Sequence, residues 1–153
     1  MPAGRIFGIA IVGTLMLGAC VSSAYASADD AIKGRQGCMK ASGKMMGELA
    51  AMFKGEKPYD AGAVKASLAA HDAACADWAK WWGEDTKKGE TVETWAKPEI
   101  WSDPEGFKAA GEAFYGKYVA LAQSKDEASF KAAFQEVGNG CKGCHEKFRR
   151  PKE

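Results

Sequence analysis

The spacing of apolar residues follows a helical period along most of the chain, and this limits the fold more than any other feature. Across residues 29–54, Ile32, Met39, Met46 and Phe53 recur every seven residues, which places them on one side of a helix. Similar stripes begin near residues 61, 103 and 126, and no useful stretch shows the alternation of a β-strand. The sequence therefore predicts an all-α fold, an antiparallel four-helix bundle in up-down-up-down order.

Capping residues and polar segments predict where these helices begin and end. Asp60 is a suitable N-cap for a helix over residues 61–82, and Asp103 followed by Pro104 is a typical helix start. The second helix carries apolar residues at spacings of three and four, which puts His71 and Cys75 on its buried side. Residues 83–102 form a long polar connection, which we expect to pack across the bundle because apolar residues gather at its end.

The first residues are typical of an export signal rather than of a folded helix. Residues 6–18 are apolar and uncharged, too few to span a bilayer, and Ala24-Tyr25-Ala26 has the form of a cleavage site. We therefore predict a secretory signal peptide over residues 1–26, cleavage after Ala26 with Ala28 as a second possibility, a mature domain over residues 27–153, and a periplasmic location. The alternative is a lipobox ending at Cys20, which would anchor the protein to a membrane through a lipid.

Net charge gives little indication of a nucleic-acid partner. The 21 basic and 20 acidic side chains leave a formal charge of +1, so the totals contain no strong basic face of the kind that nucleic-acid binding requires. We expect no nucleic-acid partner.

The chemistry of the chain is carried by Cys141-Lys142-Gly143-Cys144-His145. Two cysteines separated by two residues and followed by histidine are the attachment signature of c-type haem, since each thiol bonds one vinyl group and the imidazole reaches the iron. A zinc ribbon would need a second cysteine pair at similar spacing, and a thioredoxin-type motif would need a βαβ unit, neither of which the sequence shows. We predict one covalently attached haem c, held by Cys141 and Cys144 with His145 as an axial ligand.

With its haem motif near the C-terminus, the chain resembles the class II c-type cytochromes, the cytochrome c′ family. Members of this family are exported four-helix bundles with the motif in the same place. The resemblance covers essentially all of the mature chain. Besides the haem motif it includes four short segments: Arg35-Gln36, Lys57-Pro58-Tyr59-Asp60, Pro98-Glu99-Ile100-Trp101 and Phe148-Arg149.

The resemblance implies that the residue four positions after Arg35 faces the iron opposite His145, and that residue is Met39. Antiparallel packing of the first and last helices agrees, because it brings the start of one beside the end of the other. We expect Met39 to be the sixth ligand, as in the low-spin subgroup of c-554 and c-556 type. His71 as the ligand, an open sixth position, and a Met39 that only fills core space are the alternatives.

Three further expectations concern the surroundings of the haem. The resemblance suggests that Arg35 contacts a haem propionate, and Arg149, one turn after His145, is expected to shield the proximal face. Cys38 and Cys75, a pair that the family does not need, lie nearly level in an antiparallel hairpin that turns near Lys57. We predict a disulfide between them, with two buried free thiols as the alternative.

Together these features predict a one-electron carrier with a six-coordinate His/Met haem, which makes and breaks no substrate bonds and is therefore not an enzyme. The alternatives are a high-spin cytochrome c′ that binds small gases such as NO or CO, and a weak peroxidase with His71 as its acid–base group. Redox proteins are the expected partners, their identity is open, and the chain is expected to be a monomer or a homodimer.

Overall fold

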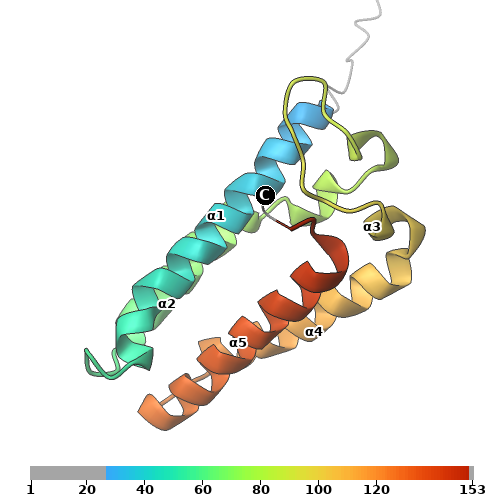
Figure 1. Cartoon of the computed structure of the whole chain (residues 1–153). Helices are drawn as coiled ribbons and strands as arrows, with labels where there is room; N and C mark the ends of the chain where they lie inside the picture. The colour runs from blue at the N-terminus through green and yellow to red at the C-terminus, as the bar shows by residue number, and fades with distance from the viewer. Residues whose placement is uncertain (1–26, 152–153) are drawn as a thin grey trace, which may run out of the picture.

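The structure is a computed structural model, and it describes residues 27–151. The predicted signal peptide and Cys20 lie outside these residues. Within them the fold is the predicted all-α four-helix bundle, in which α1 packs beside α2 and α4 packs beside α5 (Figure 1). The four long helices are α1 (Ala28–Phe53), α2 (Ala61–Cys75), α4 (Pro104–Ala122) and α5 (Glu127–Phe148).

Side chains cap the N-terminus of each long helix. Ser27 and Asp30 form a reciprocal capping box at the start of α1, and Asp126 forms one at the start of α5. The Asp60 carboxylate accepts hydrogen bonds from the backbone N–H groups of residues 62 and 63, and Asp103 caps α4. Because these carboxylates satisfy N–H groups that have no partner inside the helix, the predicted starts are confirmed.

The second helix is shorter than predicted. It ends at Cys75, and the chain continues as two 3₁₀ turns, η1 (Trp78–Trp81) and η2 (Glu84–Thr86). Trp82 packs edge-on against Phe107 of α4, with 4.7 Å between the ring centroids. The helical spacing of the tryptophans was therefore misleading, because these rings belong to an aromatic cluster beyond the end of α2.

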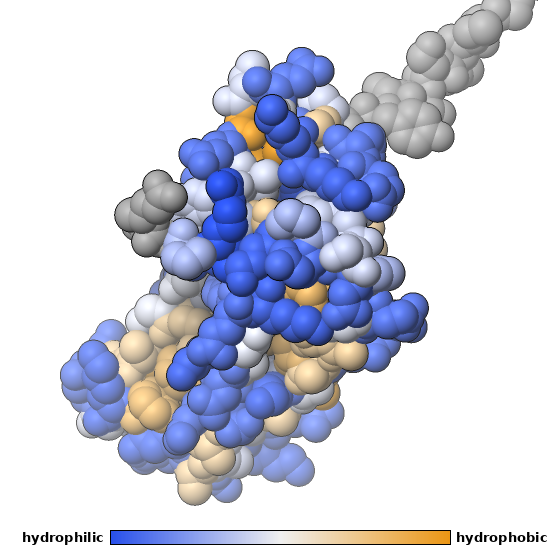
Figure 2. Space-filling view, turned by 45° about the vertical axis from the view of Figure 1, so that its right-hand side comes forward, coloured by the Kyte–Doolittle hydropathy of each residue, from blue (hydrophilic) through white to orange (hydrophobic). Residues whose placement is uncertain are grey.

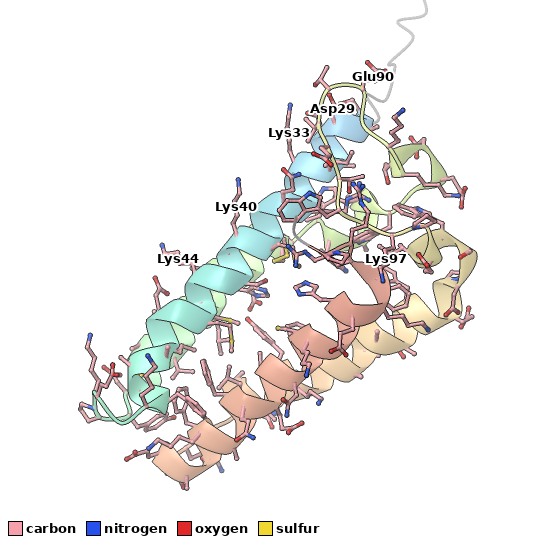
Figure 3. All side chains as sticks on the ribbon, in the orientation of Figure 1. Asp29, Lys33, Lys40, Lys44, Glu90 and Lys97 are labelled. Atoms are coloured by element: carbon pink, nitrogen blue, oxygen red, sulfur yellow. A yellow bond between two sulfur atoms is a disulfide. The ribbon has the colours of Figure 1, made fainter. Side chains whose placement is uncertain are left out.

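The long connection packs across the bundle, as predicted. At one end the Asp29 carboxylate of α1 accepts hydrogen bonds from the backbone N–H groups of Glu90, Thr91 and Val92 (Figure 3). At the other end, Lys97 donates its N–H to the carbonyl of Phe148 at 3.0 Å. A short helix that the sequence pattern did not predict, α3 (Glu99–Ser102), then leads into α4. The connection is thereby tied to the first helix and to the end of the last one.

The main hydrophobic core occupies one end of the bundle. It is built from the C-terminal half of α1, from α2, and from the halves of α4 and α5 that adjoin their shared turn. Its fully buried members are Met45, Leu49, Leu121, Phe130 and Val137. The N-terminal half of α1 and the C-terminal half of α5 lie at the opposite end, and these two segments carry the predicted site residues.

The surface of the molecule is predominantly polar. Figure 2 shows a largely hydrophilic face with separate apolar patches. Among the described residues, no helix combines the length and the apolar character that crossing a membrane would require.

Candidate haem site

The two cysteines of the haem motif lie three positions apart in the last two turns of α5. Both are free thiols with half-buried side chains. Burial raises the pKa of each thiol, and the neighbouring Cys141 raises that of Cys144 further. Two unbridged thiols one helical turn apart fit the attachment of a porphyrin edge, which needs both on the same side of a helix.

The side chain of His145 follows directly on the same helix and is half-buried. Burial lowers the pKa of its imidazole, and the nearby positive charge of Arg149 lowers it further. Both effects favour the neutral ring, which is the form that coordinates a metal ion. The donor set of Cys141, Cys144 and His145 therefore suits a covalently attached haem.

Met39 lies on α1 with 40% of its surface exposed, although it shares a seven-residue spacing with apolar neighbours. Met45, Leu49 and Met52 of the same helix are buried in the core. Met39 is therefore not a core residue, and this alternative for it was wrong. Its role as an iron ligand stays a prediction, as does the assignment of the three residues on α5.

Arg35 is buried, with 5% of its surface exposed, and it lies one turn before Met39 on α1. Its Nη2 donates to the Thr86 carbonyl oxygen at 2.7 Å, and its guanidinium lies over the Trp82 ring at 4.7 Å from the centroid. Burial lowers the pKa of the guanidinium, which nevertheless remains charged at neutral pH.

Two buried N–H donors near this residue have no partner among the described residues: Nε of Arg35 and Nε1 of Trp82. Buried donors are nearly always hydrogen-bonded, so these two fit an acceptor supplied by a bound group. The propionate contact predicted for Arg35 stays a prediction, and in this structure the terminal nitrogen atoms of Arg35 are engaged by Thr86 instead.

Arg149 comes directly after α5 and is held close to the haem motif. Its guanidinium lies over the Trp95 ring at 4.9 Å from the centroid, and its backbone N–H donates to the His145 carbonyl at 3.1 Å. An isolated bridge between Ala96 and Arg149 fixes the backbone here. This position is compatible with the predicted shielding of the proximal face.

Cys38 and Cys75 form a disulfide that joins α1 to α2 and closes a sequence separation of 37 residues. The structure thus contains the bridge that the hairpin register predicts. With this separation the pair cannot be a C-x-x-C-H motif, so it is distinct from the attachment cysteines of α5. Because Cys38 directly precedes Met39, the bridge ties the backbone of Met39 to α2.

His71 is a core histidine with polar partners rather than an isolated ligand. Its Nε2 lies 3.2 Å from Ser42 Oγ, and its Nδ1 lies 3.4 Å from Asp72 Oδ1. Tyr118 packs against the imidazole and donates its hydroxyl to Asp72 at 2.6 Å. These contacts account for a buried histidine on this helix without any bond to iron.

Sequence reasoning missed Thr86 as the partner of Arg35, and it missed the hydrogen-bonded chain from Tyr118 to His71. Thr86 lies in a polar segment 51 residues from Arg35, and no spacing in the sequence links the two. The chain from Tyr118 to His71 did have a signal in the sequence. The apolar stripe of the helix that begins near residue 103 includes Tyr118, which places its hydroxyl on a buried face.

Comparisons with known proteins agree with the four-helix fold and with one covalent haem c. The profile of the family described as Cytochrome C′ matches residues 30–149. Cytochrome c′ of Alcaligenes xylosoxydans xylosoxydans is 35% identical over 84% of this chain and 99% of its own length. Cytochrome c-556 of Rhodopseudomonas palustris is 34% identical over 92% of this chain and 95% of its own.

Among solved structures, a nitric oxide complex of a variant cytochrome c prime from Alcaligenes xylosoxidans superposes with a TM-score of 0.71 and 34% identity. The match covers 83% of this chain and 99% of that one. The chain is therefore a member of the cytochrome c′ family, the electron-carrying c-type cytochromes that bind one covalent haem c.

Proposed function

We propose that this cytochrome carries single electrons and also binds a small gas such as NO at an exchangeable sixth position of its iron, with Met39 lining that position. The observation that carries the proposal is the likeness to a relative solved with nitric oxide bound, over 83% of this chain. Three of the similar curated proteins, 35–38% identical to this chain, also have the name cytochrome c′. Gas binding is the first of the two alternatives to a pure electron carrier that the sequence leaves open.

The residues of α5 anchor the cofactor in this proposal. Cys141 and Cys144 form the two thioether links, and His145 binds the iron through its neutral imidazole, a state that its lowered pKa favours. The bound haem supplies one-electron exchange between ferric and ferrous iron and an open position for a diatomic ligand. Arg149, whose backbone N–H donates to the His145 carbonyl, carries a positive charge that lowers the pKa of the His145 ring further.

Met39 controls access to the sixth position in this proposal. Its thioether is flexible and weakly polar, and its exposure leaves it free to move aside. The disulfide at the preceding residue fixes the backbone while the side chain turns. Entry of a gas then requires a change of one side chain rather than of a helix.

A second candidate function is electron transfer with Met39 permanently bound to iron. The place of Met39 one turn after Arg35 on α1 favours it, because the resemblance to the family implies that the residue at this position faces the iron. The relatives named cytochrome c-556 also favour it. A neutral thioether ligand raises the reduction potential and prevents gas binding until it dissociates.

Absorption spectra of the purified ferric and ferrous protein distinguish an exchangeable sixth position from permanent ligation by Met39. The proposed function predicts broad high-spin bands and rapid CO binding to the ferrous protein. Replacement by Met39→Leu should then leave the spin state unchanged and alter only the rate of CO binding. Sharp split α and β bands, a weak far-red sulfur-to-iron band and no CO binding would contradict the proposal and support permanent ligation.

A matched control separates the role of Met39 from a general effect of losing a methionine. Met46 lies on the same helix and packs against the core, so Met46→Leu should leave both the spectrum and the CO kinetics as in the wild type. Conversion from low spin to high spin by Met39→Leu, but not by Met46→Leu, would establish the second candidate function.

A further inference from the structure

A second group of metal-binding side chains lies between α1 and α2, away from the haem motif. Cys38, His71 and Cys75 place two sulfur atoms and an imidazole nitrogen within 4.8 Å of one another. His71 and Cys75 lie one turn apart on α2, with 3.5 Å between Nε2 and the Cys75 sulfur. Two rigid helices therefore hold all three groups together before any ligand binds.

We propose that reduction of the Cys38–Cys75 disulfide converts this group into a site for Zn²⁺, with two thiolates and His71 Nε2 as the protein ligands. In a tetrahedral zinc site with Zn–S bonds of ~2.3 Å and Zn–N bonds of ~2.1 Å, the ligand atoms lie roughly 3.5–4 Å apart. The three groups already lie within reach of this spacing. Once the sulfur–sulfur bond is broken, rotation of the two cysteine side chains is enough to bring the three ligand atoms to this spacing.

The residues around His71 supply the support that a zinc-binding histidine needs. Zinc-bound imidazoles usually donate their other N–H to a carboxylate, which orients the ring and strengthens the ligand. Asp72 Oδ1 lies 3.4 Å from His71 Nδ1, and it accepts the Tyr118 hydroxyl at 2.6 Å. With Nδ1–H facing Asp72, Nε2 keeps its lone pair for the metal ion. The Cys75 sulfur lies 3.5 Å from Nε2, and Ser42 Oγ, at 3.2 Å, must give way when the ion binds.

Burial and charge also suit a zinc ion rather than a hard cation. Cys38 and His71 are buried, whereas Cys75 is half-buried and gives a route from solvent. Two thiolates neutralise the charge of Zn²⁺, so the loaded site places no net charge between the helices. Thiolate and imidazole donors select zinc over Mg²⁺ or Ca²⁺, which prefer oxygen.

The conversion is a two-electron reduction followed by an exchange of protons for metal. A trialkylphosphine and one water molecule reduce the disulfide to two thiols, and the phosphine leaves as its oxide. A protein dithiol does the same by becoming a disulfide itself. Binding of Zn²⁺ then releases the two thiol protons. In the reverse direction, thiol–disulfide exchange with a protein disulfide, which takes up the two electrons and becomes a dithiol, reforms the bridge and releases the ion.

Zinc titration of the haem-loaded full-length protein tests the proposal. The protein is reduced with a water-soluble phosphine without oxygen and titrated with Zn²⁺ against a chromophoric zinc chelator. We expect one Zn²⁺ per reduced chain and at least 100-fold weaker binding to the oxidised chain. The double variant Cys38→Ser/Cys75→Ser, treated in the same way, should also bind at least 100-fold more weakly. Equal zinc affinity in the reduced wild type and the double variant would overturn the proposal.

Alkylation gives a second readout that needs no variant to fold. Zn²⁺ should slow the reaction of Cys38 and Cys75 with iodoacetamide at least tenfold in the reduced wild type, as followed by peptide mass spectrometry. Asp72→Asn should weaken zinc binding about tenfold, because it removes the support for the imidazole. Equal alkylation rates with and without Zn²⁺ would also overturn the proposal.

Discussion

The guanidinium of Arg35 donates a hydrogen bond from Nη2 to the carbonyl oxygen of Thr86 at 2.7 Å, joining α1 to the long connection across 51 residues of sequence. Thr86 is itself held, because its hydroxyl donates toward the carbonyls of Trp81 and Gly83. This hydrogen bond holds the N-terminal half of α1, at the haem end of the bundle, against the long connection. Arg35 therefore has a structural role whatever group its Nε meets.

Replacement of Arg35 by alanine should lower the free energy of unfolding by about 2–4 kcal/mol. The change leaves the buried Thr86 carbonyl without its charged donor and removes the cation packed on Trp82. Guanidinium chloride unfolding at pH 7 measures the effect. Lys33→Ala is a matched control, because Lys33 is exposed and points away from the bundle (Figure 3), and it should change stability by less than about 0.5 kcal/mol. Equal losses in the two variants would refute a structural role for Arg35.

Reduction of the Cys38–Cys75 disulfide should destabilise the fold by about 3–4 kcal/mol. The bridge joins two residues that are 37 positions apart in the sequence. Cutting it returns loop-closure entropy to the unfolded chain, and the chain-entropy relation gives a loss of stability of this size. Unfolding curves with and without a phosphine reductant measure it.

The double variant Cys38→Ala/Cys75→Ala is the control for this prediction. The reductant should leave its unfolding midpoint unchanged, because no bridge remains to be cut. An equal effect of the reductant on the variant and the wild type would show that it acts elsewhere in the protein.

Tyr118 should make the fold less stable at alkaline pH. Burial raises the pKa of its phenol, and the hydrogen bond to Asp72 raises it further. The folded chain therefore keeps a proton that the unfolded chain loses above pH ~10, so stability falls as pH rises above this value, by up to about 1.4 kcal/mol per unit.

Paired tyrosine variants check this prediction by unfolding at pH 8 and pH 11. Tyr118→Phe should remove part of the alkaline loss, although it costs about 1–2 kcal/mol at pH 8 through the lost hydrogen bonds. Tyr115 lies on the same helix and is 65% exposed, so Tyr115→Phe should retain the alkaline loss of the wild type. The same pH dependence in all three proteins would count against a buried neutral phenol.

Sequence patterns predicted the parts of this protein that depend on local spacing. The caps at Asp60 and Asp103 mark helix starts, and the register between Cys38 and Cys75 follows from one hairpin. The end of α2 was missed because Trp78 and Trp82 keep a helical spacing while they pack against residues of distant segments. For the same reason the partner of Arg35 was out of reach, since its position depends on how the long connection folds. The exposure of Met39 likewise depends on how the helices pack.

Two glycines of α1 should respond in opposite ways to alanine. A Cβ at Gly34 would overlap the indole ring of Trp81, whereas a Cβ at Gly37 would meet nothing within 4 Å. Alanine is the better helix former by about 1 kcal/mol. Gly37→Ala should therefore raise the free energy of unfolding by about 0.5–1 kcal/mol. Gly34→Ala should lower it by about 1–3 kcal/mol, because the ring must move.

Thermal unfolding of the two variants and the wild type measures this difference, and each variant serves as the control for the other. They share a helix and a substitution, so helix propensity cancels between them and only the contact with Trp81 remains. Truncation of the ring supplies the decisive comparison. In a Trp81→Ala background the overlap is gone, and Gly34→Ala should then stabilise the fold by about as much as Gly37→Ala. If Gly34→Ala still destabilised the protein without the indole, the close approach of Trp81 to α1 would not be its cause.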